Sequence, residues 1–559
     1  MFPNFRLAMA WLHTWFGLVL GFVLMVVFFF GALSVFDREI DRWAIPASRF
    51  APQPMPSFDR MLKPIFAGMQ PNKENVALLQ GRVDGPIPER FDTVRSWGAY
   101  TTHRDPVLGI FANYEVPGAK DPEEGVWGTR TIDPRSGAAL PDDRLKIGSQ
   151  FFYPLHYSLN LNWMSLGTWI VGFAALTMLA ALVSGVVMHR KIFREFFTFR
   201  PKKATQRSAL DLHNMTGVVA LPFHFFFAFT GLVIFAGIYF PVGPTQLNPL
   251  HELHEKLEAQ ETGLPHERAG VAAPLASVDA MVGEAQRRWR DKGMGGEVGF
   301  LSLQHVGDAN GYVSVYRAGT DRIALVGEGI HFKASTGALL REDPPQSAVD
   351  SVNEFLTGLH LQHFRHWLLR WFYVLGGLAG CVCIATGFVF FVEKRKKQHA
   401  RQGIQGVRTV DALAVTTVTG MLVAALGMLI ANRLLPDSLP AGWPARGDLE
   451  RYAFWAGWTL ALVHALWRSA PVAQGRSNPA WREQCVAVAG LAVLAVALNW
   501  LTTGDHLWKT LGAGYWPVAG VDLFLLAGAG IAVLAARKLR RRTAGQAAGA
   551  GLARETLHA

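Results

Sequence analysis

Residues 11–36 read WLHTWFGLVLGFVLMVVFFFGALSVF, a stretch that contains no Asp, Glu, Lys or Arg. It is longer than the roughly 20 residues that an α-helix needs to cross a lipid bilayer. Half of the 559 residues are hydrophobic, and similar uncharged stretches recur at 166–188, 212–240, 371–392, 412–430, 452–466 and 486–501; the stretch at 516–536 is interrupted only by Asp522. We therefore predict a mainly α-helical membrane protein with about eight transmembrane helices.

The basic residues predict how these helices are oriented. Lys and Arg cluster just after the second, fourth and eighth predicted helices, at 190–203, 394–397 and 537–542. Short cytoplasmic loops carry such an excess, so we expect a bacterial inner-membrane protein with both termini in the cytoplasm. The net charge of +11 then reflects topology. Nucleic acid is not an expected partner, because the basic residues lie at helix ends next to lipid.

The chain also repeats itself with a period of about 200 residues. A shift of 200 aligns Leu12-His13 with Leu212-His213, and a shift of 204 aligns Leu155-His156 with Leu359-His360. The register holds across a long extramembrane segment, which indicates duplication. Each copy is predicted to consist of a helix, a periplasmic α+β domain and a second helix.

The predicted segments follow from this repeat. Strand, turn and strand patterns occur at 130–140 and 331–340, and 278–290 has helical spacing. The segments are helix one in 1–36, a first periplasmic domain in 37–150, helix two in 151–200, helix three in 205–240, a second periplasmic domain in 241–355, helix four in 356–395, an appended four-helix bundle in 408–540 and a disordered cytoplasmic tail in 541–559.

Four histidines occupy duplicated positions in these helices. His13 and His213 lie near the cytoplasmic ends of helices one and three, and His156 and His360 lie near the periplasmic starts of helices two and four. Ionisable side chains within a membrane usually face a site or a partner, and imidazole is a common ligand of haem iron. We predict two axial pairs, His13 with His213 and His156 with His360, that hold two b-type haems. If helix two runs unbroken from His156 to His189, it spans roughly 50 Å, which is enough to place the two sites at opposite faces of the membrane.

Other histidines leave alternatives open. His224 follows His213 by 11 residues, which is about three turns or 16 Å along a straight helix. This spacing is compatible with helix three carrying ligands for both haems; in the alternative interpretation His224 is a buried polar contact. His363 and His366 share a helical face with His360 and are alternatives to it. A structural interpretation, in which each imidazole bonds to a headgroup, water or a backbone carbonyl, also stays open.

Several motifs of other chemistries are missing. The segment HELHE at 251–255 departs from the spacing of zinc peptidases and indicates a solvated helix. Cys381, Cys383 and Cys485 lie in or beside predicted helices, and no Cys-x-x-Cys-His motif for covalent haem attachment occurs. There is no glycine-rich nucleotide loop either. A separate electron donor, a quinol or a cytosolic reductase, is therefore expected.

Taken together, these features resemble the PepSY-associated transmembrane helix family, which includes bacterial iron-regulated membrane proteins and ferric-siderophore reductases. The resemblance covers roughly residues 5–395. It rests on the Leu-His-x-x-x-Gly openings at 12–17 and 212–217, the Leu-His pairs at 155–156 and 359–360, the Ser/Thr-Gly pairs at 184–185 and 386–387, and the strand-turn segments at 131–140 and 331–340. It implies four core helices, two periplasmic PepSY modules, b-haem, and reduction of Fe(III)-siderophore complexes on the periplasmic side. The helices after residue 408 depart from the simplest members.

Three functions compete at this point. The first is an electron-transfer enzyme that reduces a ferric siderophore. The second is a transporter, since internal repeats with sites between helices are also typical of transporters, although this repeat keeps one orientation. The third is a non-catalytic PepSY module that regulates a periplasmic partner, which would leave the histidine pairs unused.

Overall fold

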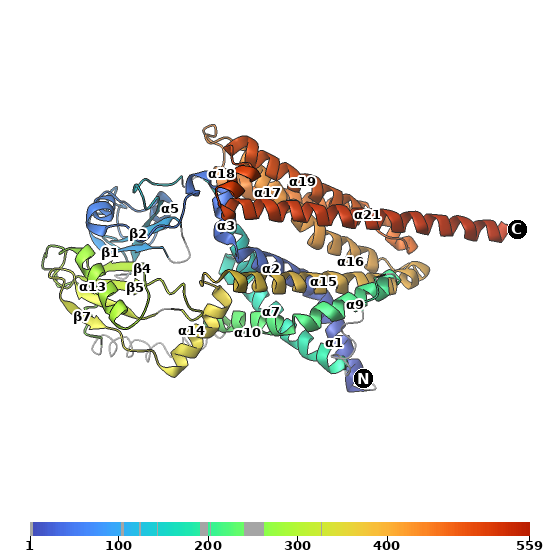
Figure 1. Ribbon diagram of the computed structural model, residues 1–559, viewed down its shortest axis with the longest axis horizontal. Helices are drawn as coiled ribbons and strands as arrows, with labels where there is room; N and C mark the ends of the chain where they lie inside the picture. Colours follow the sequence, from blue (N-terminus) through green and yellow to red (C-terminus); the bar gives the residue numbers. More distant parts are fainter. Residues whose placement is uncertain are drawn as a thin grey trace. The chain divides into compact units, whose positions relative to one another are not determined.

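The chain folds into two compact units, each built from separated parts of the sequence (Figure 1). The computed structural model describes residues 4–101, 106–121, 124–141, 144–189, 199–201, 203–239, 262–325 and 327–558, with backbone only after 541. The helical unit comprises Met1–Pro46, Asp143–Leu232 and Trp367–Ala559, and the sheet unit comprises Ala47–Asp142 and Val233–His366.

The helical unit contains the predicted membrane helices. Its elements are α1 (Phe5–Val19), α2 (Gly21–Ser34), α3 (Asp37–Ala44), η3 (Ile147–Phe152), α6 (Tyr153–Ser158), η4 (Trp163–Ser165), α7 (Leu166–Met188), α9 (Thr205–Val219), α10 (Leu221–Ile234), α15 (Trp367–Gln402), α16 (Gly406–Val415), η5 (Thr416–Gly420), α17 (Met421–Leu434), α18 (Arg446–Trp467), η6 (Ala470–Gln474), α19 (Ala480–Thr503), α20 (Leu507–Gly512) and α21 (Trp516–His558).

Among the described residues, five helices are long and apolar enough to cross a membrane, and two bent pairs raise the number to seven if each pair is one span. The straight spans are Trp163–Met188, Trp367–Gln402, Gly406–Leu434, Ala480–Thr503 and Trp516–Arg541, and the bent pairs are α1 with α2 and α9 with α10. They coincide with seven of the eight predicted helices. The eighth, 452–466, is helical within α18, but α18 is not among these spans because charged residues occupy its first two turns.

The two bends were not predicted from the sequence, and they fall at equivalent places in the repeat. The angle is 61° between α1 and α2 and 64° between α9 and α10, and the breaks fall at Leu20 and Ala220. Pro222 is the second residue of α10, and it favours a break there because proline has no N–H to donate to the preceding turn. Gly21 weakens the helix at the first break. His213 and His224 therefore lie on two segments of a bent pair, so the single straight helix from which the 16 Å spacing was derived is wrong.

The second predicted helix is also interrupted. Short α6 is separated from α7 by a loop in which Leu159, Asn160, Met164 and Ser165 have positive φ angles. Gly167 lets the chain pass close to α6, since a Cβ atom there would lie 1.7 Å from the carbonyl oxygen of Ser158. The prediction of one continuous helix from His156 to His189 is therefore wrong, and the helix length of roughly 50 Å calculated for it does not apply.

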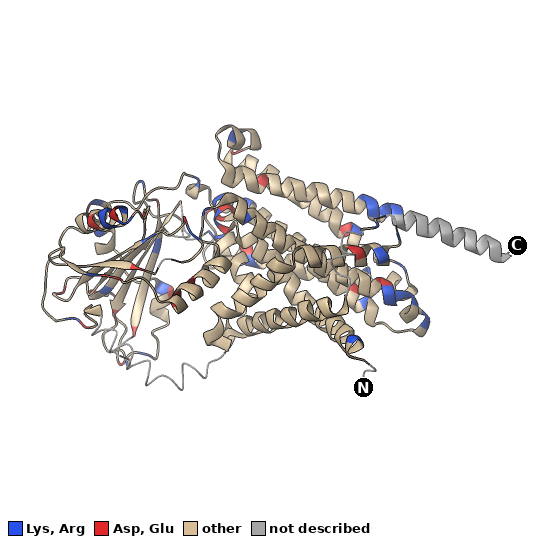
Figure 2. Ribbon diagram, turned by 60° about the horizontal axis from the view of Figure 1, so that its bottom comes forward, with Lys and Arg blue, Asp and Glu red and all other residues tan. Residues whose placement is uncertain are grey.

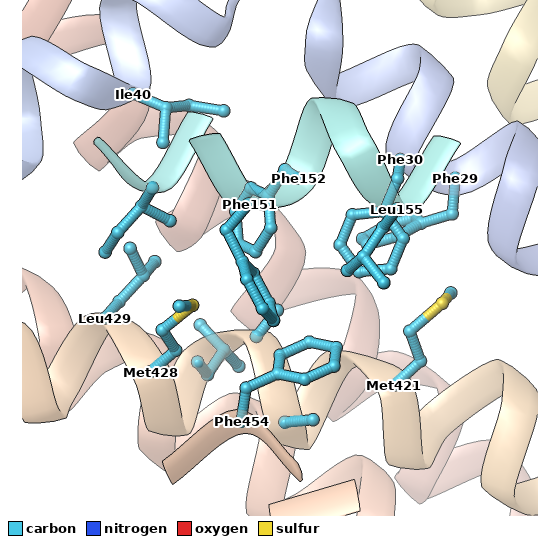
Figure 3. Close-up of a cluster of buried hydrophobic side chains, with 14 of the residues drawn as sticks. Phe29, Phe30, Ile40, Phe151, Phe152, Leu155, Met421, Met428, Leu429 and Phe454 are labelled. Atoms are coloured by element: carbon cyan, nitrogen blue, oxygen red, sulfur yellow. The ribbon is translucent and has the colours of Figure 1, made fainter. Parts of the chain in front are cut away.

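A cluster of buried aromatic and aliphatic side chains joins the appended bundle to the first half of the repeat (Figure 3). Phe30 of α2 contacts Phe152 and Phe454, and Phe151 contacts Phe454 edge-on with ring centroids 4.9 Å apart. Phe30, Phe151 and Phe454 are almost fully buried. Between membrane-spanning helices such contacts stabilise through close van der Waals packing, so the bundle is an integral part of the helical unit.

Helix α3 adds polar contacts between the same parts. Trp43 donates from Nε1 to the buried carboxylate of Asp522 on α21 at 2.8 Å, and Asn499 of α19 also donates to Asp522. The guanidinium of Arg433 on α17 lies 4.8 Å from the Trp43 ring centroid and donates to the Trp43 carbonyl. These hydrogen bonds give partners to the polar atoms of Trp43, Asp522 and Arg433, whose burial without partners would be unfavourable.

The sheet unit is formed by both extramembrane segments together. Its elements are η1 (Pro46–Ser48, which begins at the last residue of the helical unit), η2 (Phe58–Leu62), α4 (Lys63–Ala67), α5 (Lys73–Ala77), β1 (Val94–Tyr100), β2 (Leu108–Glu115), β3 (Gly125–Ile132), α11 (Ala236–Tyr239), α13 (Val278–Asp291), β4 (Val298–Gln304), β5 (Tyr312–Arg317), β6 (Gly329–Lys333), β7 (Leu339–Glu342) and α14 (Ala348–Leu361). The predicted strand, turn and strand at 331–340 and the helix at 278–290 are present. At 130–140 the first strand is the end of β3, but after the turn Ala139 forms only an isolated bridge with Ile132 instead of a second strand.

The strands form one antiparallel sheet in the order β3-β2-β1-β4-β5-β6-β7. The sequence predicts two separate domains, but β1 of the first segment pairs with β4 of the second. Gly98 lies opposite Ser302, with Ser96 opposite Gln304 and Tyr100 opposite Phe300. This register has local twofold symmetry with an offset of 204, the value found in the sequence repeat. Pairing β1 with β4 removes two exposed strand edges, which are prone to aggregation.

Two further features repeat across the sheet. The turns after β3 and β6 have the same hydrogen bonds, from Gly137 to Asp133 and from Gly337 to Lys333. Both glycines have φ near +75°, a conformation that favours glycine over other residues. The duplication is therefore present in the local geometry as well as in the sequence.

The helices η2 and α13 begin against each other and exchange capping bonds. Ser57 and the Phe58 amide donate to Asp279, whereas Ser277 and the Val278 amide donate to Asp59. A carboxylate near a helix N-terminus accepts orphan amides and complements the helix dipole. Each half of the sheet unit thus caps the other.

Two further predictions concern the basic clusters and the C-terminal tail. Figure 2 shows Lys and Arg gathered at one end of this unit, where α15 and α21 carry the clusters at 394–397 and 537–541. Most of the third cluster, at 190–198, lies outside the described residues. The structure continues α21 to His558, whereas the sequence predicts a disordered tail; the segment is rich in Ala, Leu and Arg, which favour helix.

Candidate functional site

The strongest candidate site lies where α1, α7, α9 and α15 bring two duplicated histidines together. The rings of His13 on α1 and His213 on α9 have centroids 6.1 Å apart and nearly perpendicular planes, at 81°. They lie 200 residues apart in the sequence. The structure therefore brings together the first of the two predicted pairs.

Both rings are held in the same way by a neighbouring helix. Nδ1 of His13 lies 2.9 Å from the carbonyl oxygen of Ala181 on α7, and Nδ1 of His213 lies 2.8 Å from the carbonyl oxygen of Cys383 on α15. Because a carbonyl only accepts, Nδ1 must carry the proton and donate. In a neutral imidazole the lone pair is then on Nε2, the nitrogen that is available to a metal.

A glycine on the partner helix lets each ring approach. A Cβ atom at Gly185 would lie 3.3 Å from Cε1 of His13, and one at Gly387 would lie 3.4 Å from Nδ1 of His213. Each glycine follows the accepting carbonyl by four residues. In an α-helix the side chain at that position lies over the earlier carbonyl, so glycine exposes the carbonyl to the imidazole.

His156 shows the same arrangement at a different place in the helical unit. Its Nδ1 lies 2.8 Å from the carbonyl oxygen of Val27 on α2, and Gly31 again follows that carbonyl by four residues. A Cβ atom at Gly31 would lie 2.7 Å from Nδ1 of His156. This contact is closer than real Cβ atoms tolerate, so only glycine is compatible with the position of the ring.

His224 lies near the same part of α2. Its side chain is 2% exposed, its ring packs edge-on against Phe28 at 5.4 Å, and it bonds to the backbone of Gly376. Within the part of the chain that the structure describes, its Nε2 is buried without a hydrogen-bond partner. Such an orphan nitrogen is costly unless something binds it, so His224 remains a candidate ligand.

The other predicted partner, His360, lies in the last turn of α14 in the sheet unit. The pairing of His156 with His360 stays a prediction, and His363 and His366 also lie in the sheet unit. His464 bonds to Glu483 and Gln484 in the appended bundle, and His506 caps α20; both have structural roles. The HELHE segment at 251–255 lies outside the described residues.

The carbonyl partners were missed by the sequence reasoning. Ala181 and Cys383 have no side-chain chemistry that would single them out, yet both precede a repeated Ser/Thr-Gly pair by three residues. Ser184 also lies 3.3 Å from Nδ1 of His13 through its hydroxyl. Cys383 places its Sγ 3.5 Å from Nδ1 of His213. A search for His paired with a helix glycine would have found these positions.

These residues fit a haem better than a bare metal ion. Among the described residues, no group of three or more His, Cys, Asp or Glu side chains could hold a metal. A haem iron needs only two axial protein ligands. Two imidazoles bound to one metal at about 2.0 Å each place their ring centres roughly 6 Å apart, and His13 and His213 have this separation.

The fold and the site define a class: a multi-pass membrane protein with duplicated helices, intramembrane histidines held by backbone carbonyls, and two extramembrane segments that share one sheet. The chain belongs to the family described as the PepSY-associated TM region, whose model matches residues 10–394. This confirms the resemblance found in the sequence, and the match ends before α16, so the appended bundle lies beyond it.

A relative from Pseudomonas aeruginosa is similar over most of its own length. It carries the name uncharacterized protein PA4219, is 28% identical over 372 residues, and the match covers 63% of this chain and 87% of the relative.

Proposed function

We propose that the protein carries electrons through the bacterial inner membrane by means of b-type haem and reduces Fe(III)-siderophore complexes on the periplasmic side. The observation that carries the proposal is the His13–His213 pair, with ring centroids 6.1 Å apart and both Nδ1 atoms bonded to backbone carbonyls. This arrangement leaves an Nε2 lone pair on each of two half-buried rings. An imidazole that only stabilised the packing of two helices would not require a second imidazole, held in the same way, beside it.

The residues of the chain would contribute binding and orientation. His13 and His213 would hold one haem, and His156 would hold a second together with His360 or His224. A bound haem supplies a one-electron redox change. The carbonyls of Ala181 and Cys383 fix the tautomer and orientation of the first pair, and such outer partners raise the basicity of a ligand.

Two haems in succession would carry electrons outward from a quinol or a cytosolic reductase. The basic ends of α15 and α21 would face the cytoplasm, and both termini would lie there. The sheet unit would then be periplasmic, where a ferric chelate can be reached. Iron released as Fe(II) binds hard oxygen chelators less tightly, so reduction would free it from the siderophore.

The visible spectrum of the purified protein tests the proposal. Protein from haem-replete cells should show a Soret band and, after dithionite, a sharp α-band typical of two axial histidines, with about two haems per chain that acid acetone extracts. Mixing reduced protein with a ferric siderophore and a ferrous trap should return the oxidised spectrum. A colourless protein would contradict the electron-transfer function, and a stable reduced spectrum would contradict the reductase activity.

Histidine variants test the ligand pairs. His13→Ala and His213→Ala should each remove about half of the haem or convert it to high spin, and the double variant should lose little more, because an axial ligand acts only with its partner. The same comparison of His156→Ala with His360→Ala and His224→Ala identifies the second pair. His506→Ala, which removes an exposed cap, is the matched control. A haem content unchanged in His213→Ala would exclude the first pair.

A further inference from the structure

The sheet unit has an aromatic face that the proposed electron path does not use. Ala99, Ile110, Leu301 and Val313 point to one side of the sheet and belong to the core shared with α13 and η2. Side chains alternate along a strand, so their neighbours point to the opposite, open face. Six aromatic residues of β1–β5 lie on that face, and we call them the aromatic platform: Tyr100, Phe111, Trp127, Phe300, Tyr312 and Tyr316.

The rings of the platform form a continuous series. Phe111 on β2 contacts Trp127 on β3 at 5.5 Å and Phe300 on β4 at 6.1 Å, the latter pair stacked within 20°. Phe300 contacts Tyr316 on β5 at 5.6 Å. The series thus crosses five adjacent strands. Trp127, at its end, is 43% exposed.

Glycines in the strands make this series possible. Phe111 lies over Gly98 of β1, where a Cβ atom would be 2.1 Å from the ring, and this bare position lets Phe111 reach Phe300 two strands away. Tyr100 covers Gly109 in the same way, with three ring atoms within 2.8 Å of the Cβ position. The rings therefore lie across the strands instead of standing upright. Glycine weakens a strand and often marks a close approach.

The rest of the open face is polar but nearly uncharged. On β1–β5, which are fully described, the charged residues away from the core face are Glu115, at the end of β2, and Arg95, in the β-bulge of β1; the others are Ser, Thr, Asn, Gln and Gly. The charged groups beside Tyr316 are already paired, since Nε2 of His331 lies 3.1 Å from Asp343. Such a surface is complementary to flat, weakly charged rings rather than to a strongly charged or aliphatic ligand.

Hydrogen bonds hold His331 in place at the edge of the aromatic platform. Nδ1 of His331 lies 2.8 Å from the Ser314 hydroxyl. Burial disfavours ionisation of Asp343, but the bonds from His331, the Gly329 amide and Arg341 outweigh it and lower the pKa of Asp343 to about 2. The tyrosine rings on either side of His331 are thus supported by an ordered network. A preorganised surface loses little entropy when it binds.

We propose that the aromatic platform binds iron chelates through their aryl rings, so that the protein prefers phenolate-type ferric chelates to chelates without aromatic rings. This inference rests on the proposed reduction of ferric siderophores. Stacking on Trp127, Phe111 and Phe300 would hold the aryl groups, while the neighbouring hydroxyls and amide N–H groups would donate hydrogen bonds to their oxygens.

The experiment compares two defined probes with the full-length purified protein. One is the iron(III) complex of a bis-phenolate chelator, and the other is the iron(III) complex of a linear trihydroxamate without aromatic rings. Binding is measured by equilibrium dialysis and reduction by trapping Fe(II). Trp127→Leu and Phe300→Leu keep apolar volume but remove a π-face. Each should weaken binding of the phenolate complex and raise its KM about three- to tenfold, with kcat and the trihydroxamate unaffected.

A control variant and a fold check accompany the test. Trp508→Leu replaces a tryptophan that is 83% exposed on α20 in the helical unit and should change neither probe. Thermal unfolding should show that the platform variants remain folded. Equal weakening of both probes, or no effect of either platform variant on the phenolate complex, would overturn the inference.

The two proposals fail separately. If the wild type reduces the trihydroxamate but neither binds nor prefers the phenolate complex, the aromatic platform is not a chelate site and the reductase function stands. If the protein lacks haem and reduces neither probe, the reductase function fails. The platform inference then survives only if dialysis still shows phenolate binding that depends on Trp127 and Phe300.

Discussion

At the scale of single residues, the recurring device is a histidine, a helix carbonyl and a glycine four residues later. A helix carbonyl has two lone pairs and uses one within the helix. Glycine at the fourth following position leaves the other lone pair open to an imidazole. The three sets are His13 with Ala181 and Gly185, His213 with Cys383 and Gly387, and His156 with Val27 and Gly31.

The glycines should respond to alanine in proportion to their contacts. Gly31→Ala places Cβ 2.7 Å from Nδ1 of His156, which should displace the ring and lower both the unfolding temperature and the haem content. Gly185→Ala, with a contact of 3.3 Å, should have a smaller effect. Gly490, which has no atom within 4 Å of its Cβ position, is the control. A Gly31→Ala protein that matches Gly490→Ala would show that the His156 ring is not held as described.

Asp41 should make stability depend on pH. Burial, followed by repulsion from Asp37, raises its pKa to about 7 despite hydrogen bonds from Ser149 and the Gly148 amide. The folded state keeps the proton up to about pH 7, whereas the unfolded chain loses it near pH 4. The free energy of unfolding should therefore decrease as pH rises from about 4 to 7. We expect a decrease of about 2 kcal/mol, about half of the full value for a shift of this size, because Asp41 keeps some contact with solvent that weakens the effect.

The Asp41→Asn variant tests this dependence, since asparagine cannot ionise but still accepts the amide hydrogen bonds. Thermal unfolding in detergent between pH 4 and 8 should show a flatter profile for the variant and a higher unfolding temperature than the wild type at pH 8. Parallel profiles for the two proteins would assign the pH dependence to other groups.

At the scale of elements, α18 matters most because its composition falls short of a membrane span. It nevertheless runs antiparallel to α16 and α17 along their whole length. Asn432 donates to Glu450 at one end, and Arg408 donates to Ser469 at the other. The charged Glu450 is fully buried and bonds to Arg446 and Asn432, which explains why a charged helix can lie within the bundle.

We therefore expect eight crossings, with the loops before and after α18 on opposite sides of the membrane. Reporter fusions at 440 and at 476 should give opposite signals, and a fusion after Arg541 should match one at Lys397. Fusions at 440 and 476 that report the same side would leave seven crossings and place α18 outside the membrane.

At the scale of the whole molecule, duplication has produced shared structures rather than two independent copies. The halves meet at the β1–β4 pair and at the exchanged caps of η2 and α13. The helical unit likewise draws His13 from one copy and His213 from the other. Neither copy contains a complete sheet or a complete histidine pair.

The exchanged caps allow a test of this mutual dependence. Each of these carboxylates caps a helix of the opposite half of the sheet unit. Asp59→Ala and Asp279→Ala should therefore each lower the free energy of unfolding by about 1 kcal/mol, or the unfolding temperature of the sheet unit by about 2–4 °C. The exposed Asp92, which pairs with Arg90, gives the control Asp92→Ala. If either Asp59→Ala or Asp279→Ala unfolds at the same temperature as Asp92→Ala, the caps do not join the halves.

The sequence by itself determined the membrane character, the duplication and the family. Uncharged runs and the spacing of Leu12-His13 and Leu212-His213 are properties of the chain that can be counted without a fold. The length of an uncharged apolar stretch decides whether a helix can span a membrane. Two segments with similar sequences are expected to fold alike, so the repeat predicts two similar structural units. Seven of the eight predicted helices and the strand-turn segments follow from such local patterns.

Only the tertiary structure decided which segments meet. The joining of β1 with β4 and the meeting of His13 with His213 depend on contacts between residues far apart in the chain. The partners of His13 and His213 are backbone carbonyls, and every residue has a carbonyl, so no residue type marks them. Packing selects among them, because a ring can approach only where a glycine on the neighbouring helix leaves space.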